Sequence, residues 1–257
     1  MFQTYEAVFE NHSVLKSQSL NEGLNGAIRT LEQLYTGYSD GILRDIIIET
    51  QENRIRLKSG VVIYQGKLFH LEHEVEAELE PNGQQVFLKL RFQEAQIKDG
   101  MKKWTADVIL DESGITRNNE MELCRFCYQA GARLRTEYNC FQDYGVPYNV
   151  VNIIHAPYAA PKEATISPQI TRAFAEEMLQ GGLSDPYDIA FCFECLRQEA
   201  VSAAGIRQYL TCKLHIPIQQ MANSQVYVYL ERILNNKKNT GENMQKTAIG
   251  QRRLIVD

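Results

Sequence analysis

The chain has 257 residues, of which 44% are hydrophobic and 23% are charged, and its formal net charge is −5. This composition can fill one or two cores, and it disfavours a nucleic-acid partner, because coating nucleic acid requires concentrated lysine and arginine. The first residues lack the basic and apolar segments of a signal peptide, and no apolar run reaches the ~20 residues that span a bilayer. We therefore expect synthesis in the cytoplasm, no membrane partner, and six cysteines kept as thiols.

The first predicted element is a helix over residues 19–35. Ser19 and Glu22 have the spacing of a capping box, in which each side chain accepts a hydrogen bond from the other residue's backbone amide. An apolar stripe with helical spacing follows at Leu20, Leu24, Ile28, Leu31, Leu34 and Tyr35. Gly23 and Gly26 weaken this helix, so its stripe must dock, either on the sheet of its own chain or on a neighbouring subunit.

Short β-type runs separated by glycines and polar turns follow this helix. They cover residues 46–50, 54–57, 61–64, 67–69 and 104–110. Strands of this length, punctuated by glycine, are typical of an antiparallel sheet, a sandwich or a small barrel.

The segment Pro81-Asn82-Gly83 predicts a two-residue turn between two strands, which would form a hairpin. One face of that hairpin would be apolar, and the other would carry opposite charges in register. The expected pairs are Val75–Leu90, Ala77–Leu88, Leu79–Val86, Glu76–Lys89 and Glu74–Arg91.

The second half of the chain is predicted to be helical. A helix is expected over residues 120–135, with Leu123, Phe126, Cys127, Ala130 and Leu134 on one face, and an ordered aromatic loop over residues 138–161. Cap signals then predict four helices packed as a bundle, over residues 167–180, 184–197, 202–214 and 218–234. The predicted class is α+β, with an N-terminal helix and antiparallel β-domain over residues 1–117, a helical domain over 118–235, and a flexible basic tail over 236–257.

Two CxxC pairs are the strongest metal-like pattern in the sequence. Cys124 and Cys127 form one pair, and Cys192 and Cys195 form the other. The spacing is that of a zinc site, but both pairs fall in aromatic segments that are predicted to be helical, where residues three apart pack into a core. We expect core thiols, and a zinc site or a redox pair remains as an alternative.

Three histidines are the remaining candidates for chemistry. His70 and His73 differ in strand parity, so they are expected on opposite faces and not around one ion. His155 lies in the aromatic loop with Cys140 and Asp143, where a Cys–His site is conceivable and a hydrogen-bonded core histidine is the expectation. The sequence lacks a phosphate-binding glycine loop and a GxSxG elbow, so we predict no enzyme and no catalytic, cofactor or metal residue.

Segments 14–21, 41–45 and 57–67, a charged hairpin and the turn Asp99-Gly100 follow one another over residues 10–115. This order resembles structural proteins of phage tails and related contractile injection systems, specifically baseplate or tail-fibre adaptor segments. The resemblance implies a β platform that forms oligomers, with a trimer favoured, and helices that contact other structural subunits of a phage or phage-like particle. The alternatives are a metal- or thiol-dependent enzyme centred on the loop Tyr138–Tyr158 and the cysteine pairs, or a cytoplasmic adaptor that binds a protein through its helices.

Overall fold

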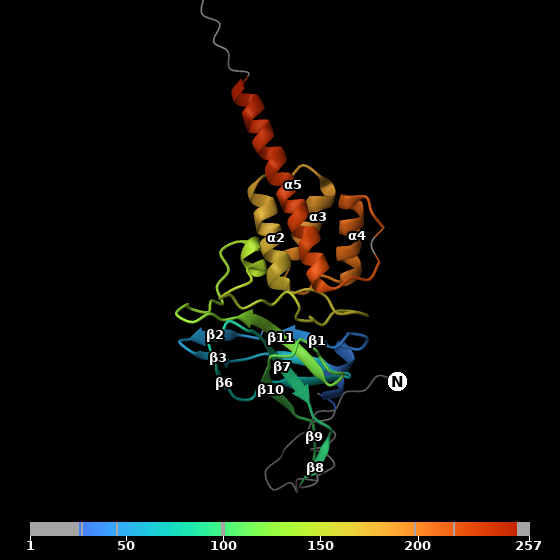
Figure 1. Cartoon of the computed structure of the whole chain (residues 1–257). Helices are drawn as coiled ribbons and strands as arrows, with labels where there is room; N and C mark the ends of the chain where they lie inside the picture. The colour runs from blue at the N-terminus through green and yellow to red at the C-terminus, as the bar shows by residue number, and fades with distance from the viewer. Residues whose placement is uncertain are drawn as a thin grey trace, which may run out of the picture.

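The strands and the helices occupy separate layers in the computed structural model of the chain (Figure 1). The structure describes residues 26, 28–44, 46–98, 101–197, 199–217 and 219–250, and for residues 101, 102 and 238–250 it describes the backbone alone. The α+β class, with N-terminal strands and C-terminal helices, is confirmed. The predicted capping box at Ser19 and Glu22, the turn Asp99-Gly100 and residues 251–257 lie outside the described residues.

A short helix over residues 28–34 leads into the strand region. It ends in a turn at residues 35–37, where Gly37 has a φ of 83°, a backbone conformation that glycine adopts without a steric cost at a helix C-terminus. The predicted helix is therefore confirmed over the part of it that is described.

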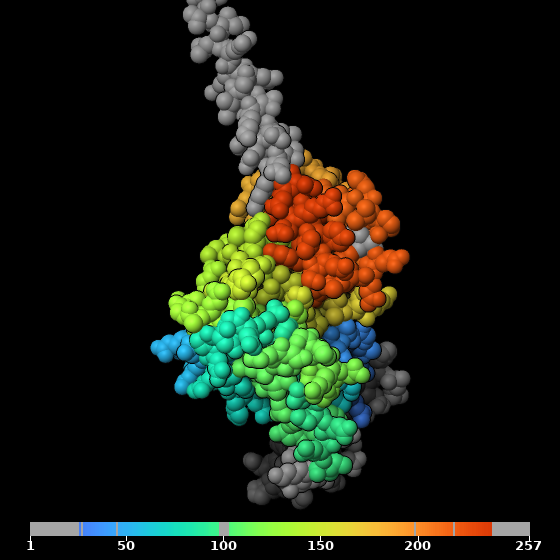
Figure 2. All heavy atoms as spheres, in the orientation of Figure 1, coloured from blue at the N-terminus to red at the C-terminus, as the bar shows by residue number. Residues whose placement is uncertain are grey.

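Eleven strands build four small antiparallel sheets within the described residues. Three of the sheets have three strands and one has two; Figure 2 shows the green segment around the two-stranded ribbon projecting from the rest of the strand region. The first sheet is β1 (Gly41–Arg44), β4 (Val61–Tyr64) and β5 (Lys67–His70); the second is β2 (Ile48–Gln51), β3 (Arg54–Leu57) and β6 (Val75–Glu78); the third is β10 (Ala106–Asp111), β7 (Gln85–Phe92) and β11 (Glu120–Cys127); the ribbon is β8 (Gln96–Lys98) and β9 (Met101–Lys103).

The predicted hairpin around Asn82-Gly83 is wrong, because β6 pairs with β3 and not with β7. Arg56 faces Glu76, and its Nε donates to the Glu76 carboxylate at 2.6 Å. The run Arg54–Leu57 alternates arginine with aliphatic residues. It therefore complements the acidic strand β6 as well as the predicted partner, residues 86–91, would. Strand β7 does not pair with β6 and lies at the centre of the third sheet instead, where Lys89 is opposite Ile109 and Glu122.

The predicted helix over residues 120–135 is also wrong, because residues 120–127 form strand β11. The pairing register with β7 shifts between Glu122 and Cys124, which marks a β-bulge at Leu123. A bulge adds one residue to the strand and breaks the two-residue alternation. All residues of β11 except Arg125 are also buried, so the strand shows no alternation of apolar and polar positions that would distinguish it from a helix.

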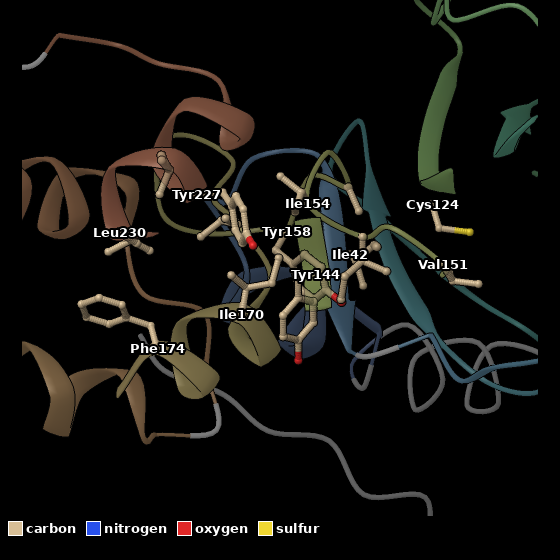
Figure 3. Packing of buried hydrophobic residues seen from close by; sticks show 14 of the residues in the cluster. Ile42, Cys124, Tyr144, Val151, Ile154, Tyr158, Ile170, Phe174, Tyr227 and Leu230 are labelled. Atoms are coloured by element: carbon tan, nitrogen blue, oxygen red, sulfur yellow. The ribbon is translucent and has the colours of Figure 1, made fainter. Parts of the chain in front are cut away.

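The loop over residues 138–161 lies between the strand and helix layers (Figure 1). It contains one short 3-10 helix, η1 (Phe141–Gly145). It is tied to β11 by two backbone hydrogen bonds between Arg125 and Asn152, of 2.9 and 2.7 Å. Figure 3 shows side chains of this loop, including Tyr144, Val151, Ile154 and Tyr158, packed between Ile42 and Cys124 of the strands and the helical residue Ile170.

Four helices lie side by side above this loop (Figure 1). The N-caps of the first three, Ser167, Asp185 and Ser202, lie within one residue of the predicted starts, and each accepts a hydrogen bond from a backbone amide in the first turn. Their aromatic core includes a stacked pair, Phe191 and Tyr209, with centroids 3.8 Å apart. The bounds are α2 (Pro168–Gln180), α3 (Pro186–Cys195), α4 (Ala203–Leu214) and α5 (Asn223–Gly250).

The last helix is longer than predicted. It begins at Asn223 rather than at residue 218, and it continues through residues 236–250, which were expected to form a flexible tail. Lys, Glu, Gln and Met sustain a helix even where no apolar face is buried, so polar composition alone did not mark its end. The Lys237 ammonium also donates to the Met178 carbonyl in the last turns of α2, which holds this stretch against the bundle.

Candidate functional site

The cysteine pairs lie in two separate layers of the fold. Cys124 is on strand β11, and Cys192 and Cys195 are on helix α3; all three are fully buried. Burial raises the pKa of the Cys192 thiol to about 11 and raises the pKa of the other two thiols further. Cys127, at the end of β11, donates from Sγ to the Gly83 carbonyl at 2.9 Å. Cys124, Cys192 and Cys195 are core thiols, as the sequence predicted, although Cys124 lies on a strand and not on the predicted helix. Their raised pKa values disfavour the thiolate form of these three side chains.

The described residues also contain no group of three or more His, Cys, Asp or Glu side chains arranged to hold a metal ion. His155 is half-buried, and burial followed by the positive charge of Arg125 lowers its pKa, while Glu122 opposes the shift. The charges that act on His155 therefore come from an ion pair of β11, in which Arg125 Nε lies 2.6 Å from Glu122 Oε1. Asp143 accepts from the Asn139 amide at 2.7 Å, and Cys140 is exposed.

A buried lysine organises the loop between β10 and β11. The Lys89 side chain has no solvent exposure, and its ammonium donates to Asp111 Oδ2 at 2.8 Å, to the Ser113 carbonyl at 2.7 Å and to the Ile115 carbonyl at 2.8 Å. Three donors thus meet three acceptors, which satisfies the ammonium completely. This arrangement fixes the loop and holds Ile115, which is 74% exposed, at the surface.

Two carboxylates around Lys89 have lowered pKa values. For Asp111 the main causes are the hydrogen bonds from Lys89 and from the Ser113 amide. For Glu120 burial acts in the opposite direction, but the Arg117 amide, the Arg91 hydrogen bonds and the charges of Arg91 and Lys89 outweigh it. Both groups therefore favour the folded state when they are ionised.

We expect acid to remove the contribution of Asp111 to stability. A carboxyl whose folded pKa lies below its unfolded value stabilises the protein at higher pH, and this stabilisation is lost as the pH falls from the ordinary value of 3.8 through the folded value. The variant Asp111→Asn should thus be less stable than the wild type at pH 7, and the gap should narrow as the pH falls below 3.8. Urea unfolding of both proteins at several pH values measures the gap, and a gap that does not change with pH would contradict the assignment.

Three of the four described residues of the N-terminal apolar stripe face outward, and the fourth, Tyr35, is partly buried. Ile28, Leu31 and Leu34 are 52%, 49% and 65% exposed. The sequence left two docking modes open, on the sheet of the same chain or on a neighbouring subunit. These three residues are not buried on the sheet of their own chain. Apolar residues gathered on one helix face at the surface mark an interaction site more often than scattered ones do.

A second candidate is a groove of about 470 Å³ in the strand region. Residues of β5, β6 and β10 line it, and so does Trp104, the chain's one tryptophan. His70 and His73 both border it, although strand parity had predicted opposite faces. Strand β5 ends at His70, so the alternation does not continue to His73. No local motif could have indicated this groove, because it is built where separate sheets meet.

No protein-family model matches the chain, and no curated protein matches it. Among solved structures, a crystal structure of TssK is similar, with a TM-score of 0.40 and 11% identity. The match covers 90% of this chain and 69% of that one. Within the described residues, no helix combines the length and the apolar character that crossing a membrane would require.

Proposed function

We propose that this protein is a non-enzymatic structural subunit of a phage tail or phage-like particle, and that it associates with further copies of itself and with other structural subunits. The observation that carries this proposal is the outward-facing stripe of Ile28, Leu31 and Leu34. Leaving such side chains in water is unfavourable by roughly 25 cal/mol per Å² of apolar surface. A neighbouring subunit would remove that cost.

The way polar groups are used supports the same proposal. In the described part of the chain, every fully buried side-chain nitrogen and oxygen of a non-exposed residue has a hydrogen-bond partner. The buried charges of Lys89 and Glu120 are engaged with each other, with the partly exposed Arg91 and with a loop. Such groups shape and hold surfaces, which is the role of an assembly subunit.

The stripe can be tested by measuring the mass of variants in solution. The double variant Leu31→Asp, Leu34→Asp should shift the mass measured by light scattering from an oligomer toward 29.4 kDa, because charges at an apolar contact oppose association. Ile115→Asp is the matched control, since Ile115 is 74% exposed on a different element. The proposal fails for this surface if the double variant keeps the wild-type mass, or if the control loses mass equally.

A further inference from the structure

The walls of the 470 Å³ groove are edge strands of three different sheets. Strand β5 ends the order β1-β4-β5, β6 ends β2-β3-β6, and β10 ends β10-β7-β11. Within the described residues, each of the three pairs with another strand along one side alone. An unpaired strand edge offers its N–H and C=O groups to an added strand, and extended segments of other chains bind proteins in this way.

The side chains of the groove suit an extended apolar segment. Its floor is aliphatic, and Leu57, Val62 and Leu90 are at most 8% exposed. Its rim is charged: Glu72 and Asp107 supply negative charge, although Asp107 also accepts from Gln93 Nε2 at 2.8 Å. The rim also carries positive or titratable groups, at Lys103, His70 and His73.

We propose that this groove binds residues 252–257 of a second copy of the chain as an added strand. That segment reads Arg-Arg-Leu-Ile-Val-Asp. Leu254 and Val256 have the same parity, so a strand would direct both toward the aliphatic floor. Arg253 and Asp257 have the opposite parity, and their charges complement those of the rim residues Glu72, Asp107 and Lys103.

The segment must come from a second copy because of where helix α5 ends. Asn223, at the start of α5, donates from Nδ2 to the Ala156 carbonyl at 3.0 Å, which places this end on the loop above the strands. The helix has 28 residues and leads away from the strands (Figure 1), so its far end lies about 40 Å further on. The seven remaining residues span at most about 25 Å. They cannot return to their own groove.

The resulting association is head-to-tail, because the tail of one copy occupies the groove of the next. This inference rests on the proposed function, because both take another copy of the chain as the partner. It uses a different surface from the stripe at residues 28–34, so the two can fail separately.

Trp104 provides a direct test, since its fluorescence reports on the groove that it lines. The acceptor is the full-length double variant Leu254→Asp, Val256→Asp, whose own tail cannot compete. The probe is a synthetic peptide of residues 250–257. We expect a saturable change in Trp104 emission, and binding that is weaker by about a hundredfold or more when the peptide carries the same two aspartates, because each of the two buried aliphatic side chains contributes about tenfold or more.

Val75→Arg, on the groove wall, should also abolish peptide binding, and circular dichroism would establish that this variant is folded. If it is not folded, the same comparison is made with Ala106→Arg on β10. Binding that persists in a folded groove variant, or equal binding of a scrambled peptide, would overturn the inference. So would the absence of any signal both in Trp104 emission and in the anisotropy of a labelled peptide. If the wild type is an oligomer while the peptide does not bind, the proposed function stands and this inference falls.

Discussion

Replacing Lys89 by methionine should lower the free energy of unfolding by about 3–5 kcal/mol. The change keeps the length of the side chain but removes an ammonium that is fully buried and bonded to Asp111, Ser113 and Ile115. Removing one member of a buried charge network leaves the other members without compensation. For a chain of this size, the melting temperature should fall by on the order of 10 °C.

Lys58→Met is the matched control for this substitution. Lys58 forms an ion pair with Glu49 at 2.8 Å, but both side chains are partly exposed. Surface pairs of this kind contribute at most about 1 kcal/mol. Urea unfolding followed by circular dichroism compares the two variants, and equal losses of stability would show that the Lys89 cluster is not a buried network.

Gly41→Ala should cost about 3 kcal/mol, at the upper end of what overpacking usually costs. A Cβ atom at this position would lie 2.6 Å from the Ala159 nitrogen and 2.9 Å from the Pro157 oxygen, and both are backbone atoms that cannot rotate away. The same backbones are joined by hydrogen bonds between Ile42 and residues 157 and 159, each 2.8 Å long. The substitution would therefore separate β1 from the loop beneath the helices.

Gly26→Ala is the corresponding control, because a Cβ atom at Gly26 would meet nothing within 4 Å. Alanine also favours a helix over glycine, so this variant should be as stable as the wild type or slightly more stable. Chemical denaturation of both variants gives the comparison. A Gly41→Ala protein within about 0.5 kcal/mol of the wild type would mean that the contact between β1 and residues 157–159 relaxes easily.

Elements that depend on local signals could be predicted from the sequence. The caps at Ser167, Asp185 and Ser202 lie within one residue of the predicted helix starts, because a cap satisfies amides in its own first turn. Strands β3 and β4 likewise have the predicted bounds, since their polar and glycine-containing turns punctuate them. Their pairing could not be read from the same signals.

Features that depend on distant partners could not be predicted. The acidic residues of β6 match the arginines of β3 as well as the basic residues of β7, and the choice between them is made by packing across the whole sheet region. Strand β11 carries a bulge at Leu123 and is buried on both faces apart from Arg125, so its sequence lacks the two-residue alternation that marks a strand. The groove beside Trp104 arises where three sheets meet, so no segment carries its signature.

The candidate residues for chemistry were assigned with mixed success. The burial of Cys124, Cys192 and Cys195 follows from their apolar neighbours and was expected. The relation of His155 to Cys140 and Asp143 was inferred from closeness in sequence, whereas Arg125 and Glu122 on β11 supply the charges that act on this histidine. Because β11 had been predicted as a helix, its contacts with the loop could not be predicted.

The central claim is that the protein functions by associating with copies of itself. Sedimentation equilibrium of the unmodified chain over a wide range of concentrations tests it most directly. Self-assembly predicts a mass that is a multiple of 29.4 kDa and that decreases on dilution. A chain that stays at the mass of one copy at every concentration would contradict it.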